Sequence, residues 1–178
     1  MNDIYHSSSL SAGVDNNILV DLYELNCIHL LFLIFDVVII PNVIYEDETT
    51  SEIKDILKAY PFELGSLDTE IGLDTYATLL RDESFKRLSR YDRFAIAISK
   101  ENHYFCNSND KLVRKACEYL EVKYTGILGI LGRAFKKDYI TKVELESYLD
   151  DLISDKTSCY IDLKIVDQFK AEMKLSRL

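Results

Sequence analysis

Short apolar runs alternate along the chain with longer segments in which apolar residues recur at helical spacing. The runs are bounded by polar residues, which predicts buried strands. They cover residues 10–14, 36–41, 104–110 (where the strand runs into a turn) and 121–125, and a further candidate strand covers 61–67. The segments with helical spacing cover 16–35 (as one long helix or two short ones), 42–60, 67–83, 88–103, 111–120 and 126–139. Strands that alternate with helices predict an α/β fold with a central parallel sheet flanked by helices and joined by right-handed crossovers.

The length and the composition predict how the chain is divided. With 178 residues, of which 48% are hydrophobic and two are proline, the chain is long enough for one domain with a substantial core. We expect residues 1–8 to be a disordered leader, 9–140 to form the domain and 141–178 to be a C-terminal helical extension packed on it. Two amphipathic helices are predicted in that extension, at 142–154 and 161–173.

Several protein classes are disfavoured by what the sequence lacks. The most apolar stretch, residues 27–40, is shorter than the roughly 20 apolar residues that span a bilayer. The N-terminus shows no export signal, and the four cysteines show neither C-x-x-C spacing nor a zinc pattern with the three histidines. We therefore expect a cytoplasmic protein with reduced thiols and no membrane association. The net charge of −9 disfavours a general nucleic-acid coat but leaves room for a local basic patch.

Four carboxylates stand at or near the ends of predicted elements. Asp15 ends the first strand, and Asp110 follows the strand that begins at residue 104. Glu46 lies one helical turn past the second strand, and Asp92 lies in the first turn of the helix that Ser89 opens. Each of them has an ordinary structural explanation: the three aspartates fit helix caps, Asp92 as part of a capping box, and Glu46 fits a solvated helix face.

Considered together, the four carboxylates predict a metal site. The carboxyl ends of parallel strands meet at one edge of a sheet, which is where ligands bind in such folds. Carboxylates gathered there would repel one another and raise one another's pKa unless a cation neutralised them. Hard divalent cations such as Mg²⁺ or Mn²⁺ prefer oxygen ligands, and they assist the hydrolysis of phosphodiesters. The arrangement therefore predicts metal-dependent phosphodiester hydrolysis, with Asp92 as the acid that assists the attacking water.

Over roughly residues 10–140 the chain resembles the PIN domain nucleases, in the order and spacing of five stretches. The stretches are VDNNIL, VIIPNVIYEDE, LSRYDRFAIAIS, FCNSNDKLVRKACEYL and VKYTGILGILGRAFKKDYI. The resemblance implies a three-layer PIN-like fold in which Asp15, Glu46, Asp92 and Asp110 are catalytic and bind Mg²⁺ or Mn²⁺. It also implies that Ser108, two residues before the last aspartate, orients the carboxylates by hydrogen bonding.

The resemblance further implies a function and partners. The segment TGILGIL and the two tail helices are similar to the VapC-like branch with extended C-terminal helices. We therefore expect a metal-dependent endoribonuclease that acts as the toxin of a toxin–antitoxin module. Such toxins are homodimers, take RNA as substrate and are silenced by a small antitoxin protein. The alternative is a non-catalytic PIN-like module that binds proteins, while a phosphatase is disfavoured because no D-x-D-x-T or P-loop sequence is present.

A basic patch surrounds two of the acids in this otherwise acidic chain. We expect its members to contact the phosphates of single-stranded RNA, fixing the position of the strand without reading its sequence. They are Arg87, Arg90 and Arg93 around Asp92, with Lys111 and Arg114 after Asp110. The alternative is a solvated helix face. Tyr91 and Tyr104 are candidates for stacking on a base.

Overall fold

The computed structural model describes residues 10–159 and 161–175, so the expected leader over residues 1–8 lies outside the described residues. It contains a five-stranded, wholly parallel sheet with the strand order β3-β2-β1-β4-β5. The strands are β1 (Ser11–Val14), β2 (Val37–Pro41), β3 (Glu63–Gly65), β4 (Phe105–Asn107) and β5 (Tyr124–Thr125). The predicted α/β class is confirmed.

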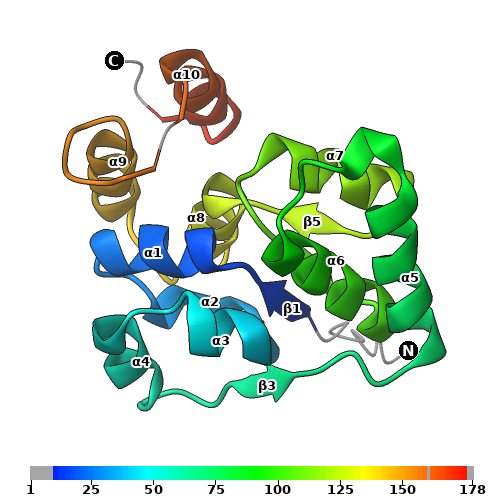
Figure 1. Ribbon diagram of the computed structural model, residues 1–178. Coiled ribbons are helices and arrows are strands. Elements are labelled where there is room, and N and C mark those ends of the chain that lie inside the picture. The colour runs from blue at the N-terminus through cyan, green and yellow to red at the C-terminus, as the bar shows by residue number, and fades with distance from the viewer. Residues whose placement is uncertain (1–9, 160, 176–178) are drawn as a thin grey trace, which may run out of the picture.

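Helices cover both faces of the sheet and form three layers (Figure 1). On one face α6 packs against β1, β2 and β4, with α5 and α7 beside it. On the other face α2 and α8 pack together, with α1 against α8. These helices are α1 (Asn16–Glu24), α2 (His29–Ile34), α5 (Glu70–Arg81), α6 (Arg90–Asn102), α7 (Lys111–Tyr119) and α8 (Ile127–Lys136), with a short 3₁₀ turn at Glu83–Phe85.

The register of β1 and β4 brings two of the predicted site residues to one edge. Val14 pairs with Asn107, so the residues that follow these strands lie at the same carboxyl edge of the sheet. The amide of Asp15 donates to the carbonyl of Asn107 at 3.1 Å, which extends the pairing by one step. Ala12 and Val14 are fully buried, and the strand therefore holds Asp15 on rigid backbone.

A glycine in β1 sets how closely α6 approaches the sheet. A Cβ atom at Gly13 would collide with the hydroxyl of Ser99, which is itself fully buried and donates to the carbonyl of Ala95 at 2.7 Å. Close packing of α6 on β1 therefore needs glycine at this position. This contact fixes the distance between the helix that carries Asp92 and the strand that ends at Asp15.

Two segments with helical spacing each form two helices, which for 16–35 was one of the two predicted alternatives. The segment 16–35 forms α1 and α2, which are separated by a turn in which Asn26 has the left-handed φ of 53°. The prediction of one helix over 42–60 was wrong, because that segment forms α3 (Asn42–Asp47) and α4 (Ser51–Leu57). Thr50 ends the first by capping the second: its hydroxyl accepts a hydrogen bond from the amide of Ile53 at 3.4 Å.

The tail contains two helices, α9 (Lys142–Leu152) and α10 (Leu163–Glu172), and Figure 1 shows both on the side of the molecule formed by α1 and α8. Their apolar residues join the same buried core as the sheet: Leu145, Leu149, Leu152, Val166 and Phe169. A capping box between Thr141 and Glu144 begins α9. In the part of the chain that the structure describes, no helix is both long and apolar enough to cross a membrane.

Candidate active site

A hydrogen-bonded chain joins Asp15 to Asp110 through Ser108. The hydroxyl of Ser108 donates to Oδ2 of Asp15 at 2.9 Å and accepts from the backbone amide of Asp110 at 3.2 Å. Ser108 and Asp15 are 1% and 3% exposed, so these bonds are shielded from water. A single side chain therefore fixes the end of β1 against the turn that follows β4.

The capping explanation holds for two of the three aspartates. Oδ1 of Asp110 accepts from the amides of Leu112 and Val113 at 2.6 and 3.0 Å, and Oδ2 of Asp92 accepts from the amide of Ser89 at 2.7 Å. Asp15 stands at the N-cap position of α1, but its side chain makes no capping bond. Each cap occupies one carboxylate oxygen and orients the other, so capping and ligand binding are compatible at Asp92 and Asp110.

The surroundings of Asp15 disfavour its charged form. Burial is the largest cause that raises its pKa from the usual 3.8 to about 7. The negative charges of Asp92 and Glu48 act in the same direction, and the hydrogen bond from Ser108 acts against them. A buried carboxylate with like charges near it is an electrostatic arrangement that a divalent cation would relieve.

Glu48 had not been selected from the sequence, yet it is the acidic residue of this segment that acts on Asp15. Its pKa is raised by partial burial and by the charges of Asp92 and Asp47, and its carbonyl accepts from Nδ2 of Asn16 at 3.4 Å. The structure places Glu46 on an exposed turn of α3, where its carbonyl accepts from Nζ of Lys54 at 3.3 Å. Glu48 follows the last residue of α3, which is why helical spacing did not identify it.

A surface depression of about 430 Å³ brings together acids and bases from the two sides of the site. It is lined by Asp92 and Asp110, by Arg87 and Lys111, and by neighbouring residues of both segments. Asp92 lies in the first turn of α6, and Asp110 is the N-cap residue of the next helix, α7. The depression therefore combines two carboxylates with two exposed cations, as a phosphate-binding rim beside a metal would require.

The other predicted phosphate contacts are placed differently. Arg93 is buried at 8% exposure and donates to the carbonyls of Phe85 and Lys86 at 3.4 and 3.2 Å, so its expected role in phosphate binding is corrected to a structural one. Arg90 lies 4.0 Å from Asp47. Arg114 donates to the carbonyl of Asn109 at 3.0 Å, which uses one of its five N–H donors.

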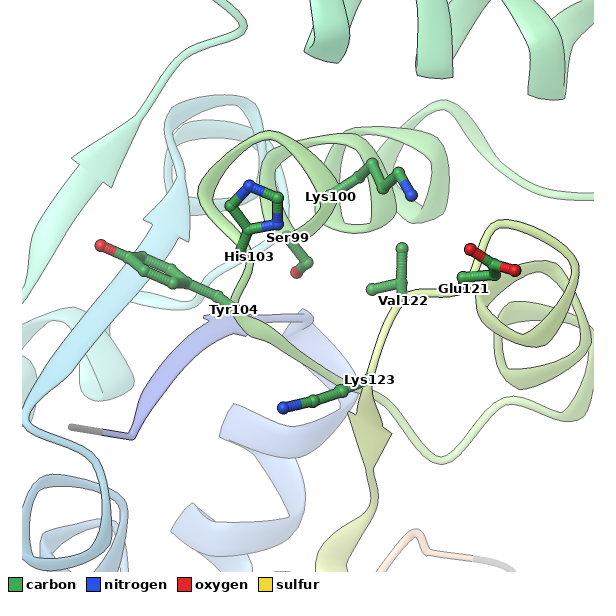
Figure 2. A pocket seen from close by; sticks show the side chains of 7 residues that line it. All are labelled: Ser99, Lys100, His103, Tyr104, Glu121, Val122 and Lys123. Atoms are coloured by element: carbon green, nitrogen blue, oxygen red, sulfur yellow. The ribbon is translucent and has the colours of Figure 1, made fainter. Parts of the chain in front are cut away.

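The two tyrosines proposed for base stacking lie in different places. Tyr91 donates to Oδ2 of Asp47 at 3.3 Å, next to the site. Tyr104 precedes β4 and lines a pocket of about 180 Å³ at the opposite, amino edge of the sheet (Figure 2). The side chains there come from the end of α6 and the loop before β5, and those of His103 and Glu121 lie on opposite sides of it (Figure 2). Tyr104 therefore lies at the opposite edge of the sheet from the carboxylates and cannot contact a ligand bound there.

The donor chemistry fits a hard divalent cation, although the carboxylates do not close on one point. Among residues 10–159 and 161–175, no three histidine, cysteine, aspartate or glutamate side chains are arranged to hold one metal ion. The expectation that all four carboxylates surround one ion is not met in this arrangement. Mg²⁺, however, usually keeps several waters and is bound through one or two carboxylates and the substrate's phosphates. Asp15, buried and near the negative charges of Asp92 and Glu48, is a carboxylate suited to that role.

Asn109, between Ser108 and Asp110, joins the turn after β4 to α1 and α8, and sequence reasoning did not identify this role. Its Nδ2 donates to a carboxylate oxygen of Asp21 on α1, and its Oδ1 accepts from the amide of Ile127 at 2.9 Å. Asp21 is 4% exposed, and burial raises its pKa to about 6 against the hydrogen bonds that lower it. A signal was present, because Asp21 stands three residues after Ile18, on the apolar face of α1.

Substituting Gly126 with alanine is expected to disturb this network. The added Cβ would lie 2.5 Å from Oδ1 of Asn109, which must then release the amide of Ile127. We expect a loss of about 1–3 kcal/mol in the free energy of unfolding, measured in urea, since overpacking costs that much in a close-packed interior.

Gly132→Ala is the matched control for that change. The added Cβ would lie 3.1 Å from a ring carbon of Phe169 and 3.2 Å from the methyl group of Met173, so these two side chains need to shift only slightly. Higher helix propensity should make this variant neutral or slightly more stable. Equal losses of stability in the two variants would show that the contact with Asn109 is unimportant.

Comparison with known proteins adds one finding to this geometry. A family model described as a PIN domain matches residues 14–174, and the match extends through both tail helices. No curated protein and no solved structure matches the chain. The matched region contains every site residue described above.

Proposed function

Because this chain belongs to the PIN domain family, we propose that it is an endoribonuclease that uses Mg²⁺ or Mn²⁺ to hydrolyse RNA phosphodiester bonds. PIN domains are typically nucleases and generally use divalent metals. The observation that supports the proposal most strongly is the buried carboxylate of Asp15, which accepts from Ser108 and lies near the charges of Asp92 and Glu48. An aspartate with a purely structural role would not stabilise the fold in this position, because its charged form is disfavoured there.

The proposed roles follow from where each side chain lies. Asp15 would hold the ion, with Asp92, Asp110 and Glu48 adding negative charge around it. Ser108 keeps the carboxylate of Asp15 oriented through its 2.9 Å hydrogen bond. Arg87 and Lys111, which line the same depression as Asp92 and Asp110, would position the phosphates of a single strand. The bound ion supplies Lewis acidity and neutralises the charge that develops on the phosphate.

The proposal is tested with variants that keep the helix caps and remove the charge. Asp110→Asn retains a good N-cap residue, and Asp92→Gln retains a capping-box residue, so both should fold. With Mg²⁺ or Mn²⁺ and transfer or messenger RNA, we expect each to lose more than about 100-fold in cleavage rate, which exceeds typical losses from outer-shell changes.

The matched control is Glu144→Gln in the capping box of α9. Its carboxylate accepts from the amide of Thr141 at 2.7 Å, so the substitution makes the same chemical change in the same motif, away from the site. It should leave cleavage within about two-fold of the natural protein, since surface changes of this kind have small effects. Cleavage that persists in both site variants would favour the alternative, a non-catalytic PIN-like module that binds proteins.

Which glutamate completes the quartet is tested in the same assay. We propose Glu48 in place of Glu46, since its charge acts on both Asp15 and Asp92. Glu48→Gln should lower the cleavage rate by about 10-fold or more, while Glu46→Gln should leave it unchanged. Asp47→Asn is the third arm, because Asp47 lies between the two and contacts Tyr91. A loss confined to Glu46→Gln would restore the assignment made from the family resemblance.

The physiological role that we propose is the toxin of a toxin–antitoxin module, acting in the cytoplasm as a homodimer. The depression around Asp92 and Asp110 offers negative charge to a basic segment of an antitoxin. Expression of the natural protein in a bacterial host should arrest growth, whereas Asp110→Asn should not. If the natural protein and Asp110→Asn both arrest growth, the toxicity does not depend on RNA cleavage.

A further inference from the structure

A second cavity, which we call the α10 cavity, lies next to the carboxylate depression and has a volume of about 550 Å³. Lys111 lines both of them, so the two are neighbours across one side chain. The α10 cavity is formed by the turn after β4, the start of α7, the junction of β5 with α8, and the beginning of α10. Figure 1 shows that junction beside α7 and α10. Its size falls in the range of roughly 300–1,000 Å³ typical of sites for small organic ligands.

The walls of this cavity combine cations with apolar surface. Lys111 and Arg114 bring positive charge, and Asp162, whose Oδ1 accepts from the amide of Lys164 at 2.8 Å, is the carboxylate on the opposite side. Leu128 and Ile165 supply apolar surface, and Ile165 is 44% exposed. A ligand with a flat apolar body, polar edges and an attached negative charge matches this combination.

We propose that the α10 cavity binds the base of a nucleotide that flanks the cleaved phosphate of single-stranded RNA. This inference rests on the proposed function, since it places the flanking phosphate near Lys111 at the boundary of the two cavities. Thr125 is among the lining residues, and its hydroxyl offers a hydrogen-bonding group to the edge of the base. The tail helix α10 thereby contributes directly to substrate binding.

The test compares two substitutions on the same helix. Ile165→Asp puts a second carboxylate into the α10 cavity, while Leu163→Asp, at a position that is 55% exposed and does not line the cavity, makes the same chemical change beside it. Both positions are exposed, so both variants should fold. The probes are a fluorescent short oligoadenylate and the same ribose-phosphate chain without bases, and the measurement is the dissociation constant by anisotropy in EDTA, without cleavage.

The natural protein should bind the oligoadenylate about ten-fold more tightly than the abasic chain, a ratio within the range for base stacking on protein side chains. Ile165→Asp should reduce that ratio to about two or less, and Leu163→Asp should leave it unchanged. If the ratio is the same in all three proteins, the cavity does not bind a base, even where RNA cleavage is normal. If the ratios behave as expected but no RNA is cleaved, the base site stands and the proposed nuclease function fails. Preferential binding of a polyglutamate peptide that Ile165→Asp abolishes would identify an acidic protein partner and overturn the assignment.

Discussion

Asn in place of Asp15 is expected to make the metal-free protein more stable at neutral pH while abolishing RNA cleavage. The pKa of Asp15 is raised from 3.8 to about 7, first by burial and next by the charge of Asp92. A carboxyl group whose pKa is higher in the folded state binds its proton more tightly there, so stability is lost as the pH rises from about 4 to about 7. At neutral pH and above, this difference corresponds to about 4 kcal/mol as an upper value.

The measurement is urea unfolding in EDTA at about pH 4 and about pH 8, which bracket the range in which the linkage acts. Asparagine is uncharged and its Oδ1 still accepts from Ser108, so Asp15→Asn should gain stability mainly at the higher pH. Glu52 and Glu144 have lowered pKa values, which give the opposite slope, so the difference between the variant and the natural protein is the informative quantity.

Asp55→Asn is the control, because Asp55 is 71% exposed in its side chain and forms an exposed ion pair with Lys58. It should change stability by no more than about 0.5 kcal/mol at either pH. A loss of stability in Asp15→Asn at both pH values would mean that the carboxylate stabilises the fold. The inference that its charged form lowers the free energy of unfolding would then be wrong.

The sequence was sufficient to predict the framework of the site. Alternating elements predicted the parallel sheet, and the strand ends predicted that Asp15 and Asp110 lie at one edge, which the pairing of Val14 with Asn107 confirms. This succeeded because strand direction and burial pattern are encoded locally, in runs of a few residues. The family match over residues 14–174 agrees with the resemblance seen in five separate stretches.

Side-chain directions could not be predicted in the same way. Helical spacing continues through Glu48 and Thr49, but the cap formed by Thr50 divides the segment and leaves Glu48 beyond the end of α3, near the site. Likewise, Arg93 and Arg90 lie in the same basic stretch around Asp92, yet the guanidinium of Arg93 is buried and donates to backbone carbonyls. The burial of Arg93 depends on the tertiary packing of α6 and its neighbours, which no local pattern contains.

Helix capping and metal binding depend on the same geometry in this molecule. A residue that follows a strand at the carboxyl edge also begins the next helix, so its side chain is close both to the free amides of that helix and to the ligand site. Asp110 uses one oxygen for the amides of Leu112 and Val113. Asp15, which makes no capping bond, gives an oxygen to Ser108 instead. The pKa of Asp15 is raised because burial and the charge of Asp92 outweigh the hydrogen bonds from Ser108 and from the amide of Asn16.

Mn²⁺ binding is expected to tighten with rising pH up to about pH 7 and then to level off. Below that pH, the metal must displace the proton that Asp15 holds because of burial and the charge of Asp92, so the dissociation constant should fall about ten-fold for each pH unit. Calorimetric titration in two buffers with different ionisation enthalpies should show the release of close to one proton at acidic pH and almost none above pH 8 or so. At about 100 times its dissociation constant, the ion should raise the free energy of unfolding by about 2.7 kcal/mol.

Two variants show whether the released proton comes from Asp15. Asp15→Asn should bind Mn²⁺ more weakly and with little dependence on pH, because no carboxyl proton remains at that position. Asp21→Asn is the matched control: its carboxyl group is also buried, with a pKa raised to about 6, but it contacts Asn109 and lies a turn and more along α1 from the site. It should leave both the slope and the number of released protons unchanged. If the slope survives in Asp15→Asn and disappears in Asp21→Asn, the ion is bound elsewhere, and the buried carboxylate at the end of β1 is not its ligand.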